Sequence, residues 1–318
     1  MSEEKFANSS LFPTELDIDA DENLADLTSK SSTKRSIGAI LVDAGVISLD
    51  QALKAIELQR EKKIRFGEAA ISLGFISEGD IRYALSYQYQ YAYLPKSSGQ
   101  HLNEDLVAAY KPFSPEVDQL CSIRSQLKLR WFDQAKGRAM LAVVGAGRFE
   151  GGSYLAANLA VVFAQMGERT LLIDTDMRAP KQHTLFQLNN QLGFTSLIAG
   201  RAAVAHAVQH IPYIPNLDVI PAGPTPPNPL ELLNRPTVDE LLNWAGKTYD
   251  IVLIDTTSLS SGADAMIVAR KAGATLAVAR ANETKIAAFN EMIADLKRSN
   301  INVVGSVLNN PPLIDINN

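Results

Sequence analysis

A glycine-rich stretch in the middle of the chain has the composition of a phosphate-binding loop. Residues 145–153 read GAGRFEGGS, follow the apolar run 140–144 and precede a helical pattern that begins at about Tyr154. In the order strand, glycine-rich turn and helix, backbone N–H groups and the positive helix end converge on an anion. The sequence therefore predicts a nucleotide-phosphate site, with the candidate residues Gly147, Arg148, Gly151, Gly152, Ser153 and Tyr154.

The loop departs from the usual pattern GxxxxGK[ST] at the lysine. Gly151 and Ser153 fit the pattern, but Gly152 occupies the position whose lysine ordinarily reaches the β- and γ-phosphates. Positive charge nearby is found in Arg148 and, in a neighbouring loop, Arg178. Losing one charge-stabilising donor removes about 3–4 kcal/mol of transition-state stabilisation, so binding can survive where turnover does not. An ordinary glycine-rich turn is the alternative interpretation.

Three aspartates follow apolar runs at the points where the predicted strands end. Asp174 and Asp176 follow residues 170–173, and Asp255 follows residues 251–254. An open α/β sheet binds its ligands at the carboxyl ends of its strands. Carboxylates there suit Mg²⁺, which takes one or two of them together with phosphate oxygens and a loop serine. Each aspartate has a simpler alternative role as a helix N-cap or a turn residue.

Short apolar runs alternate with longer helical patterns throughout the second part of the chain. Near-continuous apolar strands are typical of parallel strands that are covered on both faces. The pattern predicts an α/β fold with a doubly wound parallel sheet, in a P-loop domain over 115–318 that opens with a helix over 115–132. The expected strands are 140–144, 170–173, 217–220, 251–254, 275–279 and 302–308.

The first part of the chain contains a repeat with an offset of 29 residues. Gly45 and Ser48 in the first copy correspond to Gly74 and Ser77 in the second. Each serine can N-cap a helix whose apolar residues fall three and four positions apart, and two such copies can cover each other's apolar faces. We expect a small, mainly α domain over 34–95, a disordered tail over 1–33 and a linker over 96–114.

Composition excludes some classes of function. The formal net charge is −5 and Lys and Arg form no dense stripe, which argues against polymeric nucleic acid as a partner. A single cysteine, Cys121, and the absence of a charged-then-apolar leader predict a cytoplasmic location. The apolar runs are shorter than the ~20 residues that cross a bilayer, so we expect membrane association only through a partner.

Several of these stretches together resemble the bacterial tyrosine kinases, and more closely the exopolysaccharide chain-length-determinant tyrosine kinases. The similarity runs through GGSYLAANLA at 151–160, LLIDTDMR at 171–178, PAGPTPPNPLELL at 221–233, YDIVLIDT at 249–256 and VVGSVLN at 303–309. The resemblance implies a P-loop fold that binds ATP and Mg²⁺ and phosphorylates tyrosine. It further implies a membrane polysaccharide co-polymerase as partner.

The resemblance also assigns roles to individual residues. It implies that Ser153, Asp174 and Asp255 ligate Mg²⁺, and that Asp176 acts with Asp174 and Asp255 as the catalytic acids. It makes Asn309 a contact of the adenine. Members of the family form homo-oligomers through a helix with the pattern Glu-x-x-Arg-x-x-Arg, where this chain has Asp118, Cys121 and Arg124.

The 29-residue repeat resembles the N-terminal domain of type II secretion ATPases, which binds cyclic di-GMP. The resemblance implies a cyclic di-GMP site built from Arg65, Gly67, Gly74 and Gln88 in the second copy and Gly38, Gly45 and Gln59 in the first. Ser36 stands where the first copy should have an arginine, with Arg35 one residue earlier. The alternative is a protein-docking module whose repeat only maintains its own core.

Two functions of different classes follow. The first is an ATP-dependent tyrosine kinase that regulates exopolysaccharide chain length, polymerisation and export. The second is a catalytically impaired regulator or scaffold that binds nucleotide and cyclic di-GMP without kinase turnover, which the glycine at position 152 favours. A partitioning-type ATPase fits less well, because that class depends on lysines in its loop.

Overall fold

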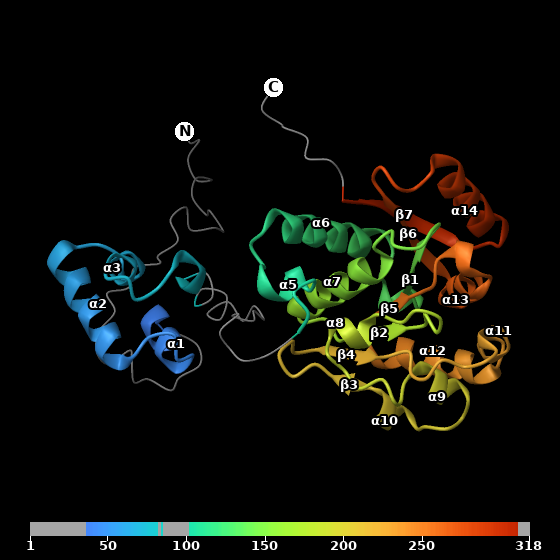
Figure 1. Cartoon of the computed structure of the whole chain (residues 1–318), viewed down its shortest axis with the longest axis horizontal. Helices are drawn as coiled ribbons and strands as arrows, with labels where there is room; N and C mark the ends of the chain where they lie inside the picture. Colours follow the sequence, from blue (N-terminus) through green and yellow to red (C-terminus); the bar gives the residue numbers. More distant parts are fainter. Residues whose placement is uncertain (1–35, 82–83, 85–101, 311–318) are drawn as a thin grey trace, which may run out of the picture. The chain divides into compact units, whose positions relative to one another are not determined.

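The computed structural model describes residues 36–81, 84 and 102–310, and it divides the chain into two units between Tyr91 and Ala92. Figure 1 shows the helices and strands of both units. The expected tail over 1–33, the candidate Gln88 and the first residues of the expected linker lie outside the described residues.

The second unit is built on a seven-stranded sheet with the order β3-β4-β2-β5-β1-β6-β7. All neighbouring pairs are parallel except β3 with β4, which is antiparallel. The predicted doubly wound fold is confirmed, and the two-residue edge strand β3 is an addition to it. The strands are β1 Met140–Gly145, β2 Thr170–Asp174, β3 Gln209–His210, β4 Leu217–Ile220, β5 Ile251–Asp255, β6 Ala274–Arg280 and β7 Asn302–Asn309.

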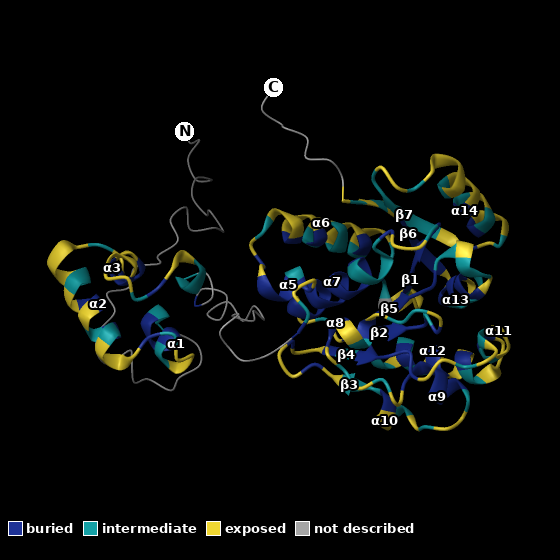
Figure 2. Ribbon diagram, viewed as in Figure 1, coloured by how far each residue is buried: buried dark blue, intermediate teal, exposed yellow. Residues whose placement is uncertain are grey.

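Helices cover both faces of this sheet, and alternate strand residues enter two separate cores. Leu141 and Val143 of β1 belong to the core on one face, whereas Ala142 and Val144 belong to the core on the other. Figure 2 shows the strands buried between the two helical layers. The first face packs against α5 Val107–Tyr110, α6 Pro115–Arg130, α7 Gly152–Gln165 and α8 Gln182–Leu185, and the second against α9 Phe194–Ile198, α10 Val204–Ala207, α11 Pro229–Leu233, α12 Pro236–Thr248, α13 Asp264–Ala272 and α14 Ile286–Arg298.

Residues 102–110 lie in the range that composition assigned to a linker, but they pack into the core of the second unit. Leu106 is fully buried. Asn158 of α7 accepts a hydrogen bond from the Ala108 N–H (3.0 Å) and donates one to the Asp105 carbonyl (2.9 Å). A buried amide that satisfies backbone groups in this way fixes α5 against α7. The segment assigned to a linker is therefore part of the folded second unit.

The first unit contains α1 Ile37–Asp43, α2 Leu49–Lys62 and α3 Phe66–Ser72, and helical residues follow Ser77. The start of α2 has the capping box expected from Ser48, which pairs reciprocally with Gln51. Helices α1 and α3 repeat each other 29 residues apart, with the same length and the same type of end. Their apolar residues share one core, which includes Leu41, Ile56 and Phe66.

Candidate functional site

The glycine-rich loop connects β1 to α7 as predicted, but the helix begins at Gly152, two residues earlier than the sequence indicated. Gly151 is its N-cap and has a φ of 91°, in the left-handed region that favours glycine. A Cβ atom there would lie 1.9 Å from Asn309 Nδ2, which donates a hydrogen bond to the Glu150 carbonyl (3.1 Å). Asn309, expected to contact adenine, thus lies against the loop itself.

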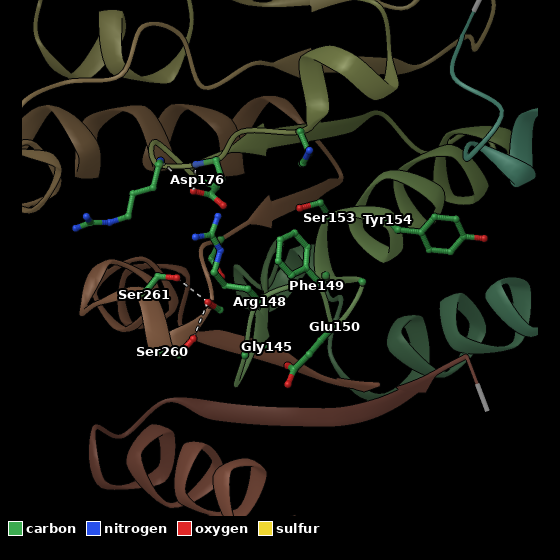
Figure 3. Close-up of a pocket in the computed structure, with 17 residues that line it drawn as sticks. Gly145, Arg148, Phe149, Glu150, Ser153, Tyr154, Asp176, Ser260 and Ser261 are labelled. Atoms are coloured by element: carbon green, nitrogen blue, oxygen red, sulfur yellow. Dashed lines mark hydrogen bonds between the residues drawn. The ribbon is translucent and has the colours of Figure 1, made fainter. Parts of the chain in front are cut away.

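The loop forms one wall of a pocket of about 580 Å³. All six residues predicted from the loop line this pocket, and so does Asp176: the predicted set is Gly147, Arg148, Gly151, Gly152, Ser153, Tyr154 and Asp176. Figure 3 shows Ser153, Arg148 and Asp176 around the opening, whereas the side chain of Tyr154 points away from it. Only the backbone of Tyr154 is therefore suitably placed for a phosphate.

Three cationic side chains line the pocket, and within the described residues only Arg178 forms an ion pair. Arg178 forms an ion pair with Asp264 (Nε to Oδ2, 2.7 Å). The guanidinium of Arg148 lies 5.5 Å from the centre of the Phe149 ring. The ammonium of Lys181 is exposed and makes no hydrogen bond or ion pair within the described part of the chain. Lys181 is the residue that sequence reasoning missed, because the search for charge stopped short of it.

Asp174 was expected to act as a metal and catalytic carboxylate, but its side chain is fully buried and does not line the pocket. Its oxygens accept hydrogen bonds from the backbone N–H groups of Asp176 (3.0 Å), Lys181 (3.1 Å) and Gln182 (3.0 Å). Burial and the neighbouring Asp255 carboxylate raise the pKa of Asp174. In this structure Asp174 shapes the turn that brings Asp176 and Lys181 to the pocket.

Asp255 lies beside Asp174, its partner in the β2–β5 register, and is also fully buried. Its Oδ2 accepts a hydrogen bond from Gln182 Nε2 (2.7 Å), and its Oδ1 is buried without a partner among the described residues. Burial raises the pKa of Asp255 to about 7, although hydrogen bonds from Gln182 and Ser153 act in the opposite direction. Gln182 also donates to the Ser153 carbonyl (3.0 Å), which ties the start of α7 to β5.

These donors fit a magnesium ion that shares its ligands with a nucleotide. Ser153 and Asp255 lie close enough to interact, and Asp255 retains an unpartnered oxygen. Among the described residues, no group of three or more His, Cys, Asp or Glu side chains is arranged to hold a metal ion without other ligands. Mg²⁺ normally keeps waters and phosphate oxygens in its shell, so this sparse donor set suits a nucleotide-bound ion better than a resident one.

The buried Asp255 carboxyl makes a testable contribution to the pH dependence of stability. Because its pKa is raised, the folded protein holds a proton that the unfolded chain releases at about pH 4, so stability falls as pH rises from about 4 to 7. Between pH 5 and 8, the natural chain should therefore lose free energy of unfolding that the Asp255→Asn variant keeps. The difference between the two losses should be on the order of 2 kcal/mol. Urea unfolding at several pH values, without nucleotide or Mg²⁺, measures this pH dependence. The exposed Glu291→Gln variant is the control. Parallel pH curves for Asp255→Asn and the natural chain would contradict the predicted contribution of Asp255.

In the first unit, the repeat glycines are explained by the fold. Gly45 and Gly74 both have a φ of 70° and end α1 and α3. The N–H of each glycine and of the residue after it bonds back to the last turn, which is the Schellman arrangement. Gly67 is required by packing, because a Cβ there would lie 2.5 Å from Ile81 Cδ1. Gly38 is buried in α1. Gly45 and Gly74 are therefore favoured by their backbone conformation with or without a ligand.

Two further candidates of the first unit differ in burial. Gln59 has a buried Oε1 without a partner among the described residues. Arg65 is exposed at the start of α3, where its backbone N–H donates to Glu68 Oε2 (3.3 Å). Gln88 lies outside the described residues.

The sheet and its loop define the class of protein. A parallel sheet covered on both faces, with a glycine-rich turn before a helix and aspartates at the ends of two adjoining strands, is a P-loop nucleotide-binding α/β domain. No family model matches the chain.

The comparisons place the chain among bacterial tyrosine-protein kinases. It is 35% identical over 223 residues to tyrosine-protein kinase YwqD of Bacillus subtilis, covering 69% of this chain and 92% of that protein. It is 35% identical over 214 residues to tyrosine-protein kinase wzc of Salmonella typhimurium, covering 67% of this chain but 29% of that longer protein. The chain belongs to the bacterial tyrosine-protein kinase family.

Solved structures agree with this assignment. The kinase domain of Escherichia coli tyrosine kinase ETK matches with a TM-score of 0.63 and 29% identity, over 71% of this chain and 91% of that one. The BceF tyrosine kinase domain matches with a TM-score of 0.60 and 31% identity, over 65% of this chain and 82% of that one. Since the chain spans less than a third of wzc, the activity and partners of such longer proteins are not established for it.

Proposed function

We propose that this chain is a nucleotide-binding, tyrosine-kinase-like regulator of exopolysaccharide chain length, polymerisation and export. The observation that carries the proposal is the convergence of Gly151, Ser153 and Asp176 on one pocket, with Asp255 directly behind the serine. Charged phosphates are the ligands for which such an arrangement of backbone N–H groups, hydroxyl and carboxylates is suited.

ATP would be held by the loop and the start of α7. The backbone N–H groups of Gly151, Gly152 and Ser153 are those of the N-cap and first turn, which have no partner within the helix. Ser153 and Asp255 would hold Mg²⁺, which supplies charge neutralisation for the phosphates. Asp176 lines the pocket, and its Oδ1 accepts hydrogen bonds from the N–H groups of Arg178 (3.0 Å) and Ala179 (2.9 Å). That orientation suits a carboxylate that accepts a tyrosine proton.

A second observation favours the regulator without kinase turnover. Glu150 stands in the loop with its side chain only 7% exposed. Its Oε1 accepts a hydrogen bond from Thr284 Oγ1 (2.7 Å), and its Oε2 is buried without a partner among the described residues. Figure 3 shows this side chain directed away from Ser153. The Glu150 carboxylate and the glycine at position 152 both make this loop less positive than a phosphate loop that contains the usual lysine. A less positive loop stabilises the transferring phosphoryl group less well.

Incubation of the full chain with γ-labelled ATP and Mg²⁺, followed by phosphoamino-acid analysis, tests this function. We expect binding of nucleotide with little or no label on tyrosine. Label on tyrosine that disappears in Asp176→Asn would establish the kinase and remove the regulator as an alternative. Failure to bind ATP at all would contradict both.

We propose a polysaccharide co-polymerase in the inner membrane as the partner that recruits the chain. Every helix in the described ranges is too short or too polar to cross a bilayer. The family's oligomerisation pattern is incomplete here, and Arg124, which fits one of its positions, donates to the Val162 carbonyl of the same chain (2.8 Å). This contact holds α6 against α7 through one guanidinium nitrogen, and Nε of the same side chain is buried without a partner among the described residues. A homo-oligomer through α6 stays part of the proposal.

Cyclic di-GMP remains a proposed ligand of the first unit, and Arg65 is its main support. The side chain is exposed, and an arginine plane can stack on a guanine while donating to its O6 and N7 atoms. Titration of the full chain with cyclic di-GMP should give an affinity at least ~10 times higher than that of Arg65→Ala. Equal affinities, or no binding, would leave the repeat as a docking module.

A further inference from the structure

A second pocket, of about 450 Å³, lies beyond the carboxyl end of β4 and shares no residue with the first. One of its walls comes from the motif PAGPTPPNPLELL at 221–233, to which the nucleotide site assigns no role. We propose that this pocket binds a phosphomonoester through Arg201 and Arg235.

The wall of the pocket is held rigidly by backbone contacts. The N–H groups of Phe194 and Thr195 donate to the carbonyls of Pro221 (2.8 Å) and Ala222 (2.9 Å). Asn190 bonds to both backbone groups of Gly223, accepting from its N–H (2.7 Å) and donating to its carbonyl (3.3 Å). A site fixed in this way loses little conformational entropy when a ligand binds.

The approach of these two segments requires glycine. A Cβ atom at Gly193 would lie 2.1 Å from the Pro221 carbonyl oxygen, and one at Gly223 would lie 2.6 Å from Thr195 Oγ1. These close contacts place Thr195 and Ser196 at the first turn of α9, directly beside the loop that follows β4.

Hydroxyl groups that the protein leaves unsatisfied line this wall. Thr195 is 5% exposed and Ser196 is 8% exposed. Neither hydroxyl has a hydrogen-bond partner among the described residues, and that of Thr195 is also sealed from solvent. A buried polar group without a partner carries a desolvation cost that a ligand oxygen can offset. The hydroxyl of Ser196 is the one that a ligand can reach without a rearrangement.

The charge of the pocket selects an anion. Arg201 and Arg235 are exposed, and neither guanidinium forms an ion pair within the described ranges. The carboxylate of Glu231 accepts a hydrogen bond from Asn228 Nδ2 (3.2 Å), so part of its charge is already stabilised. Each guanidinium group offers paired N–H donors. Two such groups suit a phosphate, which has three terminal oxygens, better than a carboxylate, which has two.

The second pocket can be filled independently of the first. Both pockets lie at the carboxyl edge of the sheet, but β4 and β1 are three strand positions apart. At ~4.8 Å per strand, this separates the two sites by about 14 Å. A phosphomonoester bound by Arg201 and Arg235 should therefore leave the affinity for Mg²⁺·ATP unchanged.

Isothermal titration of the full chain with phenyl phosphate, free phosphotyrosine and glucose 1-phosphate tests the proposal. Each of Arg201→Ala and Arg235→Ala should raise the Kd for the tightest probe at least tenfold, and the double variant should abolish binding. Arg270→Ala, an exposed arginine of α13, is the matched control and should bind as the natural chain does. Thermal unfolding of every variant checks that the fold is retained.

The probes separate the possible sources of the phosphate. A preference for phenyl phosphate and phosphotyrosine identifies a phosphorylated tyrosine as the ligand, and a preference for glucose 1-phosphate identifies a sugar phosphate. Either result supports the site. Absence of binding by all three probes at millimolar concentration, unchanged binding by the double variant, or complete competition by Mg²⁺·ATP would overturn it.

Discussion

A Gly152→Lys variant is expected to transfer phosphate from ATP to tyrosine at least about 100 times faster than the natural chain, because it restores the donor that reaches the β- and γ-phosphates. The backbone at this position has room for a Cβ atom. A Cβ atom at Gly152 would meet only Val143 Cγ1, at 4.0 Å, which is an ordinary van der Waals contact. The measurement is the rate of label incorporation from γ-labelled ATP at saturating nucleotide and Mg²⁺.

Gly152→Met is the matched control, since methionine has a side chain of similar length without the charge. It should show no gain. Equal rates for the lysine and methionine variants would mean that the missing charge is not what limits turnover. The buried Glu150 carboxylate would then be the next residue to replace.

A Lys181→Ala variant is expected to bind Mg²⁺·ATP about tenfold more weakly than the natural chain. Lys181 is the one cation of the pocket whose side chain has no partner among the described residues, whereas Arg178 is paired with Asp264 and Arg148 lies against Phe149. A single charge close to a phosphate is worth about 1–2 kcal/mol in a partly exposed site. Equilibrium titration with a non-hydrolysable ATP analogue measures the change.

The double variant Lys181→Ala, Gly152→Lys shows whether Lys181 and a lysine at position 152 both bind the nucleotide phosphates. If Lys181 replaces the missing loop lysine, its removal should cost less affinity in the Gly152→Lys background, because the restored lysine already contacts the phosphates. Lys247→Ala, on the exposed side of α12, controls for general charge effects. Equal losses in the two backgrounds, or none in either, would exclude compensation by Lys181.

The sheet could be predicted from the sequence because its strands are buried on both faces. Each appears as an apolar run, and six of the seven strands were expected within a residue or two of their bounds. The exception, Gln209–His210, is a polar edge strand of two residues, which leaves no apolar signal. The segment 102–110 was missed because its apolar residues span less than three turns of helix, too few for a clear period, although Leu106 is buried in the core and amides of α7 hold the backbone in place.

The site could be predicted only in outline. Spacing placed Ser153 in the loop and Asp176 at the strand end, and both line the pocket. Spacing does not determine which way a side chain turns within a loop. The hydrogen bonds that Asp174 accepts from its own turn were therefore not foreseen, and its role as a ligand stays a prediction. Lys181 was missed although that turn carries it to the pocket.

In the first unit, the helical repeat was predictable from apolar spacing and serine caps, but the role of its glycines was not. Gly45 and Gly74 terminate helices through the left-handed conformation, which requires glycine with or without a ligand. The two glycines by themselves therefore do not indicate a ligand.

The most direct test of the account is titration of the full chain with a non-hydrolysable ATP analogue in the presence and absence of Mg²⁺. We expect one molecule bound per chain, with affinity that increases with Mg²⁺ and falls at least tenfold in Ser153→Ala, because the serine hydroxyl would hold both the ion and Asp255. Binding that ignores both Mg²⁺ and Ser153, or no binding at all, would contradict a nucleotide site in this pocket.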